Sequence, residues 1–162
     1  MPQNNDHFIS WQQLHHDSRQ LAAQLTHKSW RGVIGIARGG LIPATIVARE
    51  LNIRLIDSLC IASYDHDQQG EITVLKSIDG DGEGFIIIDD LVDTGATAEL
   101  ARKLLPKAYF VSLYAKPAGR PYTELFIKEF SQDTWLYFPW DSAEEDGQYR
   151  YNPPLAEKIV AQ

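Results

Sequence analysis

Short apolar runs alternate with amphipathic segments along this chain, and the alternation predicts β-strands separated by α-helices. The four residues from 85 to 88 are all apolar and three of them are β-branched, which predicts a buried strand because the run is too short for a core helix. Similar runs at 32–37 and 109–115 predict two further buried strands. Apolar residues at helical spacing predict helices at about 11–25, 43–51, 98–105 and 155–160.

Strand-like residues at 53–62 and 71–75 flank a polar, turn-rich segment at 63–70. This arrangement predicts a hairpin with a long mobile tip, the kind of loop that closes over a substrate. Ligand-type side chains lie together in the tip, at Asp65, His66 and Asp67. Consecutive side chains of an extended loop diverge, however, which argues against a dedicated metal site there.

Strands with helical spacers, and polar residues gathered after the strand ends, predict an α/β fold with an open, mostly parallel twisted sheet flanked by helices. In such sheets the ligand binds beyond the carboxyl ends of the strands. Five polar residues follow predicted strand ends and are expected to lie together there: Arg38, Asp89, Asp90, Asp93 and Lys116.

The segment after the 85–88 strand carries the strongest chemical signal. Asp89 and Asp90 follow the strand directly, and two carboxylates at a strand end are costly unless they bind a cation or hydroxyl groups. The turn at 93–97 (Asp-Thr-Gly-Ala-Thr) then leads into a helix, a place where backbone N–H groups converge on an anion. A metal or hydroxyl site beside a phosphate site points to a sugar phosphate with Mg²⁺.

A second candidate anion site follows the strand at 32–37. Arg38-Gly39-Gly40 joins that strand to a helix with Pro43 in its first turn. The two glycines let a ligand approach the backbone or allow an unusual peptide geometry. The alternative is a tight turn with a solvated arginine, because short glycine-rich loops are common.

The composition limits the classes of protein that fit. A chain of 162 residues suits one domain with a sizeable core, and a net charge of −7 argues against a general nucleic-acid binder. The single cysteine, Cys60, lies in an apolar run and indicates a reducing compartment. The first residues lack the features of a signal peptide, and no run of 18 apolar residues occurs, so we expect a cytosolic protein, at most peripheral to a membrane.

The last third of the chain is less regular. Residues 134–141 are dense in aromatic side chains and are expected near the active face or a subunit contact. Residues 142–148 are small, acidic or polar and predict a mobile loop.

Taken together, these motifs resemble those of the type I purine phosphoribosyltransferases, and among them the bacterial enzymes that act on xanthine and guanine. The signature lies at 86–98, and the resemblance extends to segments 38–40, 63–67, 116–121 and 133–141. It implies the type I phosphoribosyltransferase fold, with a small hood and a mobile hairpin loop. The whole of 1–162 would be one domain, with a core at about 10–130, a hood from the N-terminal residues and about 131–154, and a tail at 149–162.

The resemblance also implies an activity in purine salvage. The enzyme would transfer the 5-phosphoribosyl group from phosphoribosyl diphosphate to N9 of guanine and xanthine, and more weakly of hypoxanthine. The products would be GMP, XMP or IMP with diphosphate, and Mg²⁺ would be the cofactor. A homotetramer without a nucleic-acid partner is implied, in the cytoplasm and at most peripheral on the inner face of the cell membrane.

Carried over position by position, the resemblance implies individual roles. Phosphoribosyl diphosphate would be bound by Arg38, Gly39, Asp89, Asp90, Leu91, Val92, Asp93, Thr94, Gly95, Ala96 and Thr97. The purine would be bound by Asp93 as acid/base near N7, Lys116 as donor to the 6-oxygen, Trp135 by stacking and Leu136 through its backbone. Mg²⁺ would be bound by Asp90 and Asp89, with Asp141 reaching the pyrophosphate or metal through water. Loop closure would involve Ser63 and Tyr64.

The sequence departs from the family pattern at two positions. The family's mobile loop carries a basic residue where this chain has Gly70, so Lys76 or another residue would substitute, or closure would contribute less. Ala96 stands where the family often has glycine, which is compatible with a helix start if the backbone there does not need a positive φ.

Three other classes of protein share some of these features. A hypoxanthine-guanine transferase would differ only in its tolerance of a second oxo group at position 2 of the purine. A regulator that senses phosphoribosyl diphosphate and binds RNA or DNA would need a basic face, which the charge of −7 disfavours. A receiver domain also uses an acidic pair, but after its first strand, whereas here the pair comes at Asp89.

Overall fold

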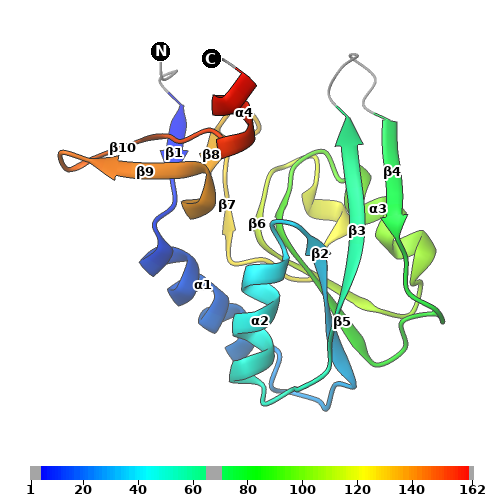
Figure 1. The fold of residues 1–162 in the computed structure, drawn as a ribbon. Helices are drawn as coiled ribbons and strands as arrows, with labels where there is room; N and C mark the ends of the chain where they lie inside the picture. The colour runs from blue at the N-terminus through cyan, green and yellow to red at the C-terminus, as the bar shows by residue number, and fades with distance from the viewer. Residues whose placement is uncertain (1–4, 65–70, 161–162) are drawn as a thin grey trace. The chain divides into compact units, whose positions relative to one another are not determined.

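The computed structural model describes residues 5–64 and 71–160, and Figure 1 shows their fold. The chain divides into two compact units. The sheet unit is His15–Gln132, and the terminal unit combines Met1–Leu14 with Asp133–Gln162. Helix α1 (Trp11–Ala23) begins in the terminal unit and continues into the sheet unit. The predicted division into core, hood and tail stays a prediction.

The sheet unit contains a six-stranded sheet in the order β4-β3-β2-β5-β6-β7. Neighbouring strands run parallel except β3 and β4, which form an antiparallel pair. The open, mostly parallel sheet and the hairpin that the sequence predicts are therefore confirmed. The strands are β2 (Gly32–Ala37), β3 (Ile56–Tyr64), β4 (Glu71–Lys76), β5 (Phe85–Val92), β6 (Tyr109–Ala115) and β7 (Lys128–Glu129), and the helices besides α1 are α2 (Leu41–Glu50), α3 (Ala96–Leu104) and the 3₁₀ turn η1 (Arg120–Tyr122).

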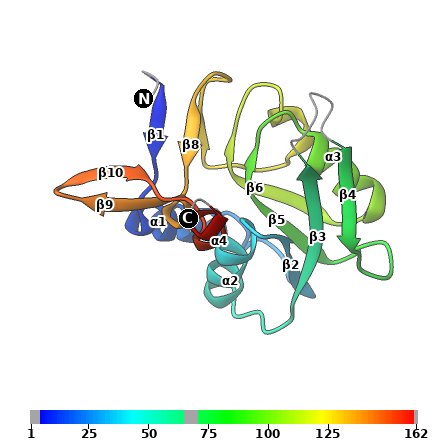
Figure 2. The same ribbon diagram turned by 45° about the horizontal axis from the view of Figure 1, so that its top comes forward.

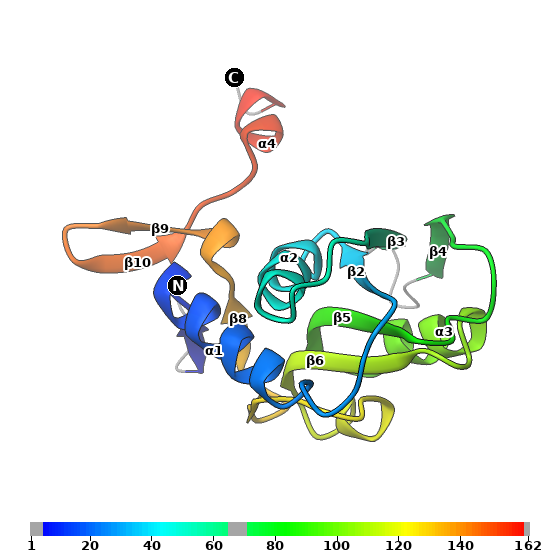
Figure 3. The ribbon, with the colours of Figure 1, turned by 90° about the horizontal axis from the view of Figure 1, so that it is seen from below.

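Successive residues of β2 point to opposite faces of the sheet, and a different helix covers each face. Gly35 faces α2, because a Cβ added there would lie 3.1 Å from the Cβ of Ala44. Ile34 and Ile36 instead belong to a buried cluster that includes Ala98 of α3. Figure 3 shows α2 on one side of β5 and β6. Helices on both faces explain why the central strands are apolar along almost their whole length.

The helix ends follow local signals in the sequence. Ser10 caps α1, since its Oγ accepts a hydrogen bond of 3.0 Å from the backbone N–H of Gln13. Asn52 follows the end of α2 with a left-handed φ of 55°, a conformation that asparagine tolerates better than most residues. Ala96 is the first residue of α3, and the positive φ, 90°, falls on Gly95 instead. The alanine at position 96 is thus compatible with the helix start.

Strands β3 and β5 each have a boundary that differs from the sequence-based expectation. Strand β3 begins at Ile56 rather than at residue 53. Strand β5 does not stop before the acidic pair but continues to Val92, because its pairing with β6 persists, with Asp89 opposite Ser112. The two carboxylates therefore stand within the last part of the strand.

The terminal unit contains two small sheets, visible in Figure 2. Strand β1 (Asp6–Phe8) pairs in parallel with β8 (Trp135–Tyr137), and β9 (Ser142–Glu145) pairs antiparallel with β10 (Gln148–Tyr151). The prediction of a mobile loop at 142–148 was wrong. Asp146 and Gly147 form the turn with φ of 53° and 75°, and an Asp-Gly pair is a strong hairpin signal that the polar composition concealed. The unit also contains η2 (Pro139–Asp141) and α4 (Leu155–Val160). Within the described residues, no helix is long and apolar enough to cross a membrane.

Candidate active site

The acidic pair lies at the carboxyl end of β5. Asp89 is buried and its Oδ1 accepts a 2.9 Å hydrogen bond from the N–H of Asp90, while Oδ1 of Asp90 accepts one of 2.7 Å from the N–H of Leu91. Burial, and after it the charge of Asp90, raises the pKa of the Asp89 carboxyl well above its usual value of 3.8. A cation beside the pair would favour the ionised form of both carboxylates.

The chemistry of this pair fits Mg²⁺. Carboxylate oxygens are hard ligands, and Mg²⁺ is commonly held by one or two carboxylates with waters and substrate phosphates completing its shell. Among residues 5–64 and 71–160 no group of three or more His, Cys, Asp or Glu side chains forms a complete metal site. Asp89 and Asp90 would therefore supply part of the shell, and a phosphorylated substrate the rest.

The turn at Arg38–Gly40 packs directly against this pair. The peptide bond between Ala37 and Arg38 is cis. A Cβ added at Gly39 would collide with the Asp90 carboxylate, and one added at Gly40 would collide with the backbone of Ile88 and Ile36. The two glycines are therefore required by close approach. The structure brings the Arg38 turn and the acidic pair together, as predicted, and the Arg38 side chain is exposed.

The turn from Asp93 to Thr97 connects β5 to the first turn of α3. Gly95, with its left-handed backbone, precedes the helix and has no side chain with which to cap it. The N–H of Ala96, the first residue of the helix, donates a 3.4 Å hydrogen bond to Thr94 Oγ1. The backbone N–H groups at a helix start, with the positive end of the helix dipole, form an anion-binding arrangement.

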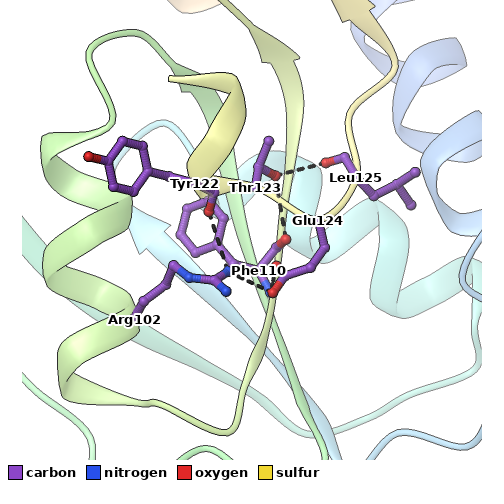
Figure 4. A network of polar contacts seen from close by, with 6 residues as sticks. All are labelled: Arg102, Phe110, Tyr122, Thr123, Glu124 and Leu125. Carbon is purple, nitrogen blue, oxygen red and sulfur yellow. Dashed lines mark hydrogen bonds and ion pairs between the residues drawn. The ribbon is translucent and has the colours of Figure 1, made fainter. Parts of the chain in front are cut away.

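A buttress supports this turn from the side of η1. The ring of Tyr122 packs on Gly95 so closely that an added Cβ would collide with it. Figure 4 shows how the buttress is held: Arg102 of α3 donates to Glu124 Oε1 at 2.6 Å and to the carbonyl of Tyr122 at 3.3 Å. Glu124 Oε2 in turn accepts a 2.8 Å hydrogen bond from the N–H of Phe110. The sequence did not indicate this network, because its members are separated by up to 22 positions.

Lys116 follows β6, and its buried ammonium donates to Oδ2 of Asp93 at 3.2 Å. The backbone holds the two loops in register, since the N–H of Lys116 donates to the carbonyl of Val92 at 2.9 Å. Gly119 lies against the same turn: an added Cβ would collide with the Val92 carbonyl and would lie 2.9 Å from the carbonyl oxygen of Asp93. The predicted meeting of Asp93 and Lys116 is therefore observed.

Gln132 is a polar partner of Asp93 that sequence reasoning missed. Its Nε2 donates to Asp93 Oδ1 at 2.7 Å, and its Oε1 accepts from the N–H of Ala118 at 3.0 Å. Gln132 comes directly before the segment at 133–141 that carries the family resemblance. This position next to a family segment was the one feature of the sequence that could have pointed to a role for Gln132. An exposed amide in a polar segment does not otherwise stand out.

Three candidate residues lie in the terminal unit. Trp135 in β8 is 61% exposed, and Leu136 beside it is buried. The N–H of Trp135 and the carbonyl of Tyr137 are both bonded to the β1 side, so the N–H and C=O of Leu136 point to the other edge of β8. The Asp141 carboxylate accepts a 3.3 Å hydrogen bond from the N–H of Phe138.

The loop residues are only partly described. Ser63 and Tyr64 end β3, whereas Asp65, His66, Asp67 and Gly70 lie outside the described residues. Lys76, the named substitute for the family's basic loop residue, donates from β4 to Asp57 Oδ1 at 2.9 Å and to the carbonyl of Ser58 at 2.8 Å.

Comparison with known proteins identifies the family. The model of the phosphoribosyl transferase domain matches residues 10–142. The chain belongs to the phosphoribosyl transferase family. A xanthine-guanine phosphoribosyltransferase of Desulfotalea psychrophila is 57% identical over 136 residues, which are 83% of this chain and 85% of that protein. Another xanthine-guanine phosphoribosyltransferase, of Chromohalobacter salexigens, is 49% identical over 151 residues, 93% of this chain and 90% of the relative.

Solved structures agree with the fold. The crystal structure of a purine phosphoribosyltransferase from Pyrococcus horikoshii superposes with a TM-score of 0.71 at 26% identity, over 84% of this chain and 93% of that one. The type I phosphoribosyltransferase fold and the enzyme class expected from the sequence are thus confirmed.

Proposed function

We propose that this chain is a purine-salvage enzyme that transfers the 5-phosphoribosyl group from phosphoribosyl diphosphate to N9 of guanine or xanthine and releases diphosphate. The observation that carries the proposal is the pairing of Lys116 with Asp93, 3.2 Å apart, at the first residue of the anion-binding turn. Asp93 therefore belongs both to the pair suited to bind a purine and to the turn suited to bind a phosphate. The 49–57% identity to proteins named as xanthine-guanine phosphoribosyltransferases supports these two bases.

The Lys116–Asp93 pair is complementary to one edge of a 6-oxopurine. N7 and O6 lie side by side on that edge of the ring system. In a base protonated at N7 they present a donor next to an acceptor. A carboxylate accepts and an ammonium has only donors to offer, so Asp93 would accept from N7–H while Lys116 donates to O6. Adenine carries an amino group at position 6 and would leave the buried ammonium without an acceptor.

Asp93 would act as the general base. As the N9 lone pair forms the new bond to C1 of the ribose, the bond from C1 to the pyrophosphate oxygen breaks and its electrons leave with the pyrophosphate. The purine gains positive charge, and the proton on N7 passes to the Asp93 carboxylate. The side chain of Asp93 is 48% exposed, which leaves room for a base to reach it.

The remaining residues of the site would bind the two ends of the sugar phosphate. The backbone of Asp93–Thr97 at the start of α3, with the hydroxyls of Thr94 and Thr97, would hold the 5-phosphate. The Arg38–Gly39 turn would hold the pyrophosphate, and Asp89 and Asp90 the ribose hydroxyls and Mg²⁺. When bound, the metal would supply positive charge that stabilises the leaving pyrophosphate.

Trp135 and Leu136 are also proposed to bind the purine. Trp135 would stack on the purine, because its ring is exposed rather than packed in a core. The backbone of Leu136, directed away from β1, would hydrogen-bond the group at position 2 of the base. Asp141 would reach the pyrophosphate or metal through water.

The decisive assay supplies the protein with Mg²⁺, phosphoribosyl diphosphate and one base at a time: guanine, xanthine, hypoxanthine or adenine. We expect nucleotide formation to be fastest with guanine and xanthine, slower with hypoxanthine, and slowest with adenine. Chelation of Mg²⁺ should abolish the reaction. Turnover of hypoxanthine without xanthine would make the chain a hypoxanthine-guanine transferase, and no turnover of any 6-oxopurine would end the proposal.

We also propose that the enzyme works as a homotetramer in the cytoplasm, at most peripheral on the inner membrane face. Light scattering of the purified protein measures the oligomeric mass. Sedimentation with vesicles of anionic phospholipid tests the membrane association, and neither result bears on the assignment of the reaction.

A further inference from the structure

Gln132 links the general base of the proposed reaction to the loop that carries the base-binding lysine. Its Nε2 lies 2.7 Å from Oδ1 of Asp93 and 3.4 Å from the carbonyl oxygen of the same residue. Its Oε1 accepts from the N–H of Ala118, two residues after Lys116, at 3.0 Å. One side chain therefore ties the turn after β5 to the loop after β6.

The two partners fix the orientation of this amide. A carboxylate can only accept hydrogen bonds and a backbone N–H can only donate, so the NH₂ group must face Asp93 and the oxygen must face Ala118. Glutamate at position 132 would keep the bond to Ala118 but place a negative charge on Asp93. Methionine would fill a similar volume and form neither bond.

The two oxygens of the Asp93 carboxylate have different partners. Oδ1 is held by Gln132 and Oδ2 faces the ammonium of Lys116 at 3.2 Å. Because the amide anchors one oxygen, the carboxylate cannot rotate about its last bond without losing a charge-assisted hydrogen bond. Oδ2 is then kept beside Lys116, where the N7–O6 edge of a purine would meet both groups.

We infer that Gln132 is a positioning residue for the phosphoribosyl transfer, which holds Asp93 so that Oδ2 receives the purine N7 proton beside Lys116. The inference rests on the proposed function, because it assigns a catalytic task to the carboxylate that Gln132 holds. It adds to that proposal a residue that acts through Asp93.

The test compares Gln132→Met and Gln132→Glu with the unchanged protein. We expect kcat with guanine to fall roughly tenfold in Gln132→Met, the effect of losing one hydrogen bond to a charged group. The loss in Gln132→Glu should be at least as large, although this variant keeps the bond to Ala118. KM for phosphoribosyl diphosphate should change little in either. Gln20→Glu, which adds the same charge at an exposed position of α1, is the matched control.

A role limited to holding the loop after β6 through the N–H of Ala118 gives a different pattern. Gln132→Glu would then behave like the unchanged protein, since the Ala118 bond survives, and only Gln132→Met would lose activity or thermal stability. That result would overturn the inference. So would unchanged kcat in both variants with melting temperatures equal to that of the unchanged protein.

A readout independent of turnover separates this inference from the proposed function. In protein labelled with ¹³C at the aspartate carboxyl carbons, the Asp93 signal is assigned by its loss in Asp93→Asn. Its chemical shift at neutral pH should change in both Gln132 variants, because the donor to Oδ1 is lost, and stay unchanged in Gln20→Glu. If the chemical shift changes but the unchanged protein turns over no purine, the link between Gln132 and Asp93 stands and the proposed function fails. If the chemical shift does not change, the positioning role is wrong whatever the activity.

Discussion

The ammonium of Lys116 lies 3.2 Å from Oδ2 of Asp93, and the two side chains differ in exposure, at 5% and 48%. A buried lysine is paired here with a carboxylate that solvent still reaches. The burial keeps the ammonium in one place, because a buried charge must retain a partner. The exposure leaves the carboxylate able to meet a ligand. This asymmetry is what a base-recognition pair needs, with a fixed donor beside an accessible acceptor.

Replacing Asp93 tests its proposed role as general base. Asp93→Asn keeps the shape of the side chain but cannot take the purine proton, so kcat should fall roughly 10²–10⁴-fold, the usual contribution of acid–base catalysis. Steady-state kinetics with guanine measure it. Asp79→Asn, at an exposed loop position, removes the same charge and should leave kcat unchanged. A near-normal rate in Asp93→Asn would reject the role.

Lys116 is expected to set the preference for 6-oxopurines. Lys116→Met removes the donor that O6 would accept, and an unsatisfied buried polar group costs about 1–3 kcal/mol. The ratio of kcat/KM for guanine over adenine should therefore fall roughly tenfold to a hundredfold. Lys103→Met on the exposed side of α3 is the control, since its ion pair with Glu99 is at the surface. An unchanged ratio in Lys116→Met would assign base selection to other residues.

Gly39 is expected to be essential for binding the sugar diphosphate. In Gly39→Ala the new Cβ collides with the Asp90 carboxylate, which must move away from the Arg38 turn. KM for phosphoribosyl diphosphate and the Mg²⁺ concentration for half-maximal rate should both rise, while the fold survives because a single carboxylate can shift. Gly80→Ala is the control: its Cβ meets nothing within 4 Å, and its φ of 93° strains the backbone only locally. Normal Mg²⁺ dependence in Gly39→Ala would disprove the close coupling of the two elements.

The buried hydrogen bond between Tyr114 and Asp17 is expected to matter for stability. The Tyr114 hydroxyl donates to Asp17 Oδ2 at 2.5 Å. Removing it in Tyr114→Phe should lower the free energy of unfolding by about 1–3 kcal/mol, measured in urea at neutral pH. Tyr151→Phe, at an exposed position of β10, should have little effect.

The same tyrosine gives a dependence on pH. Burial, and after it the bond to Asp17, raises the pKa of Tyr114 above its ordinary value of 10.0. The unfolded chain therefore loses this proton at a lower pH than the folded one, and stability falls as the pH rises above 10. The slope of unfolding free energy against pH in that range should be smaller in Tyr114→Phe. Equal slopes would show that the tyrosine does not titrate differently in the two states.

Local patterns in the sequence were sufficient for much of the sheet unit. The runs at 32–37 and 109–115 match β2 and β6 residue for residue, because a short apolar run has few ways to bury itself other than as a central strand. Helix α3 begins at Ala96, two residues before the predicted start at 98, because Ala96 and Thr97 do not contribute to the apolar periodicity. The Asp146-Gly147 pair is a local hairpin signal, but the polar composition of residues 142–148 predicted a mobile loop instead.

By itself the sequence determined the family, the order of strands β2 to β6 and helices α1 to α3, and the expectation that Asp93 and Lys116 meet beyond the strand ends. These depend on spacing along the chain and on the rule that the carboxyl ends of parallel strands share one edge of the sheet. Only the tertiary structure decided that Gly39 touches Asp90, that Tyr122 packs on Gly95 and that Gln132 holds Asp93. Such contacts join residues 27 to 51 positions apart, and their presence depends on loop geometry that no local periodicity encodes.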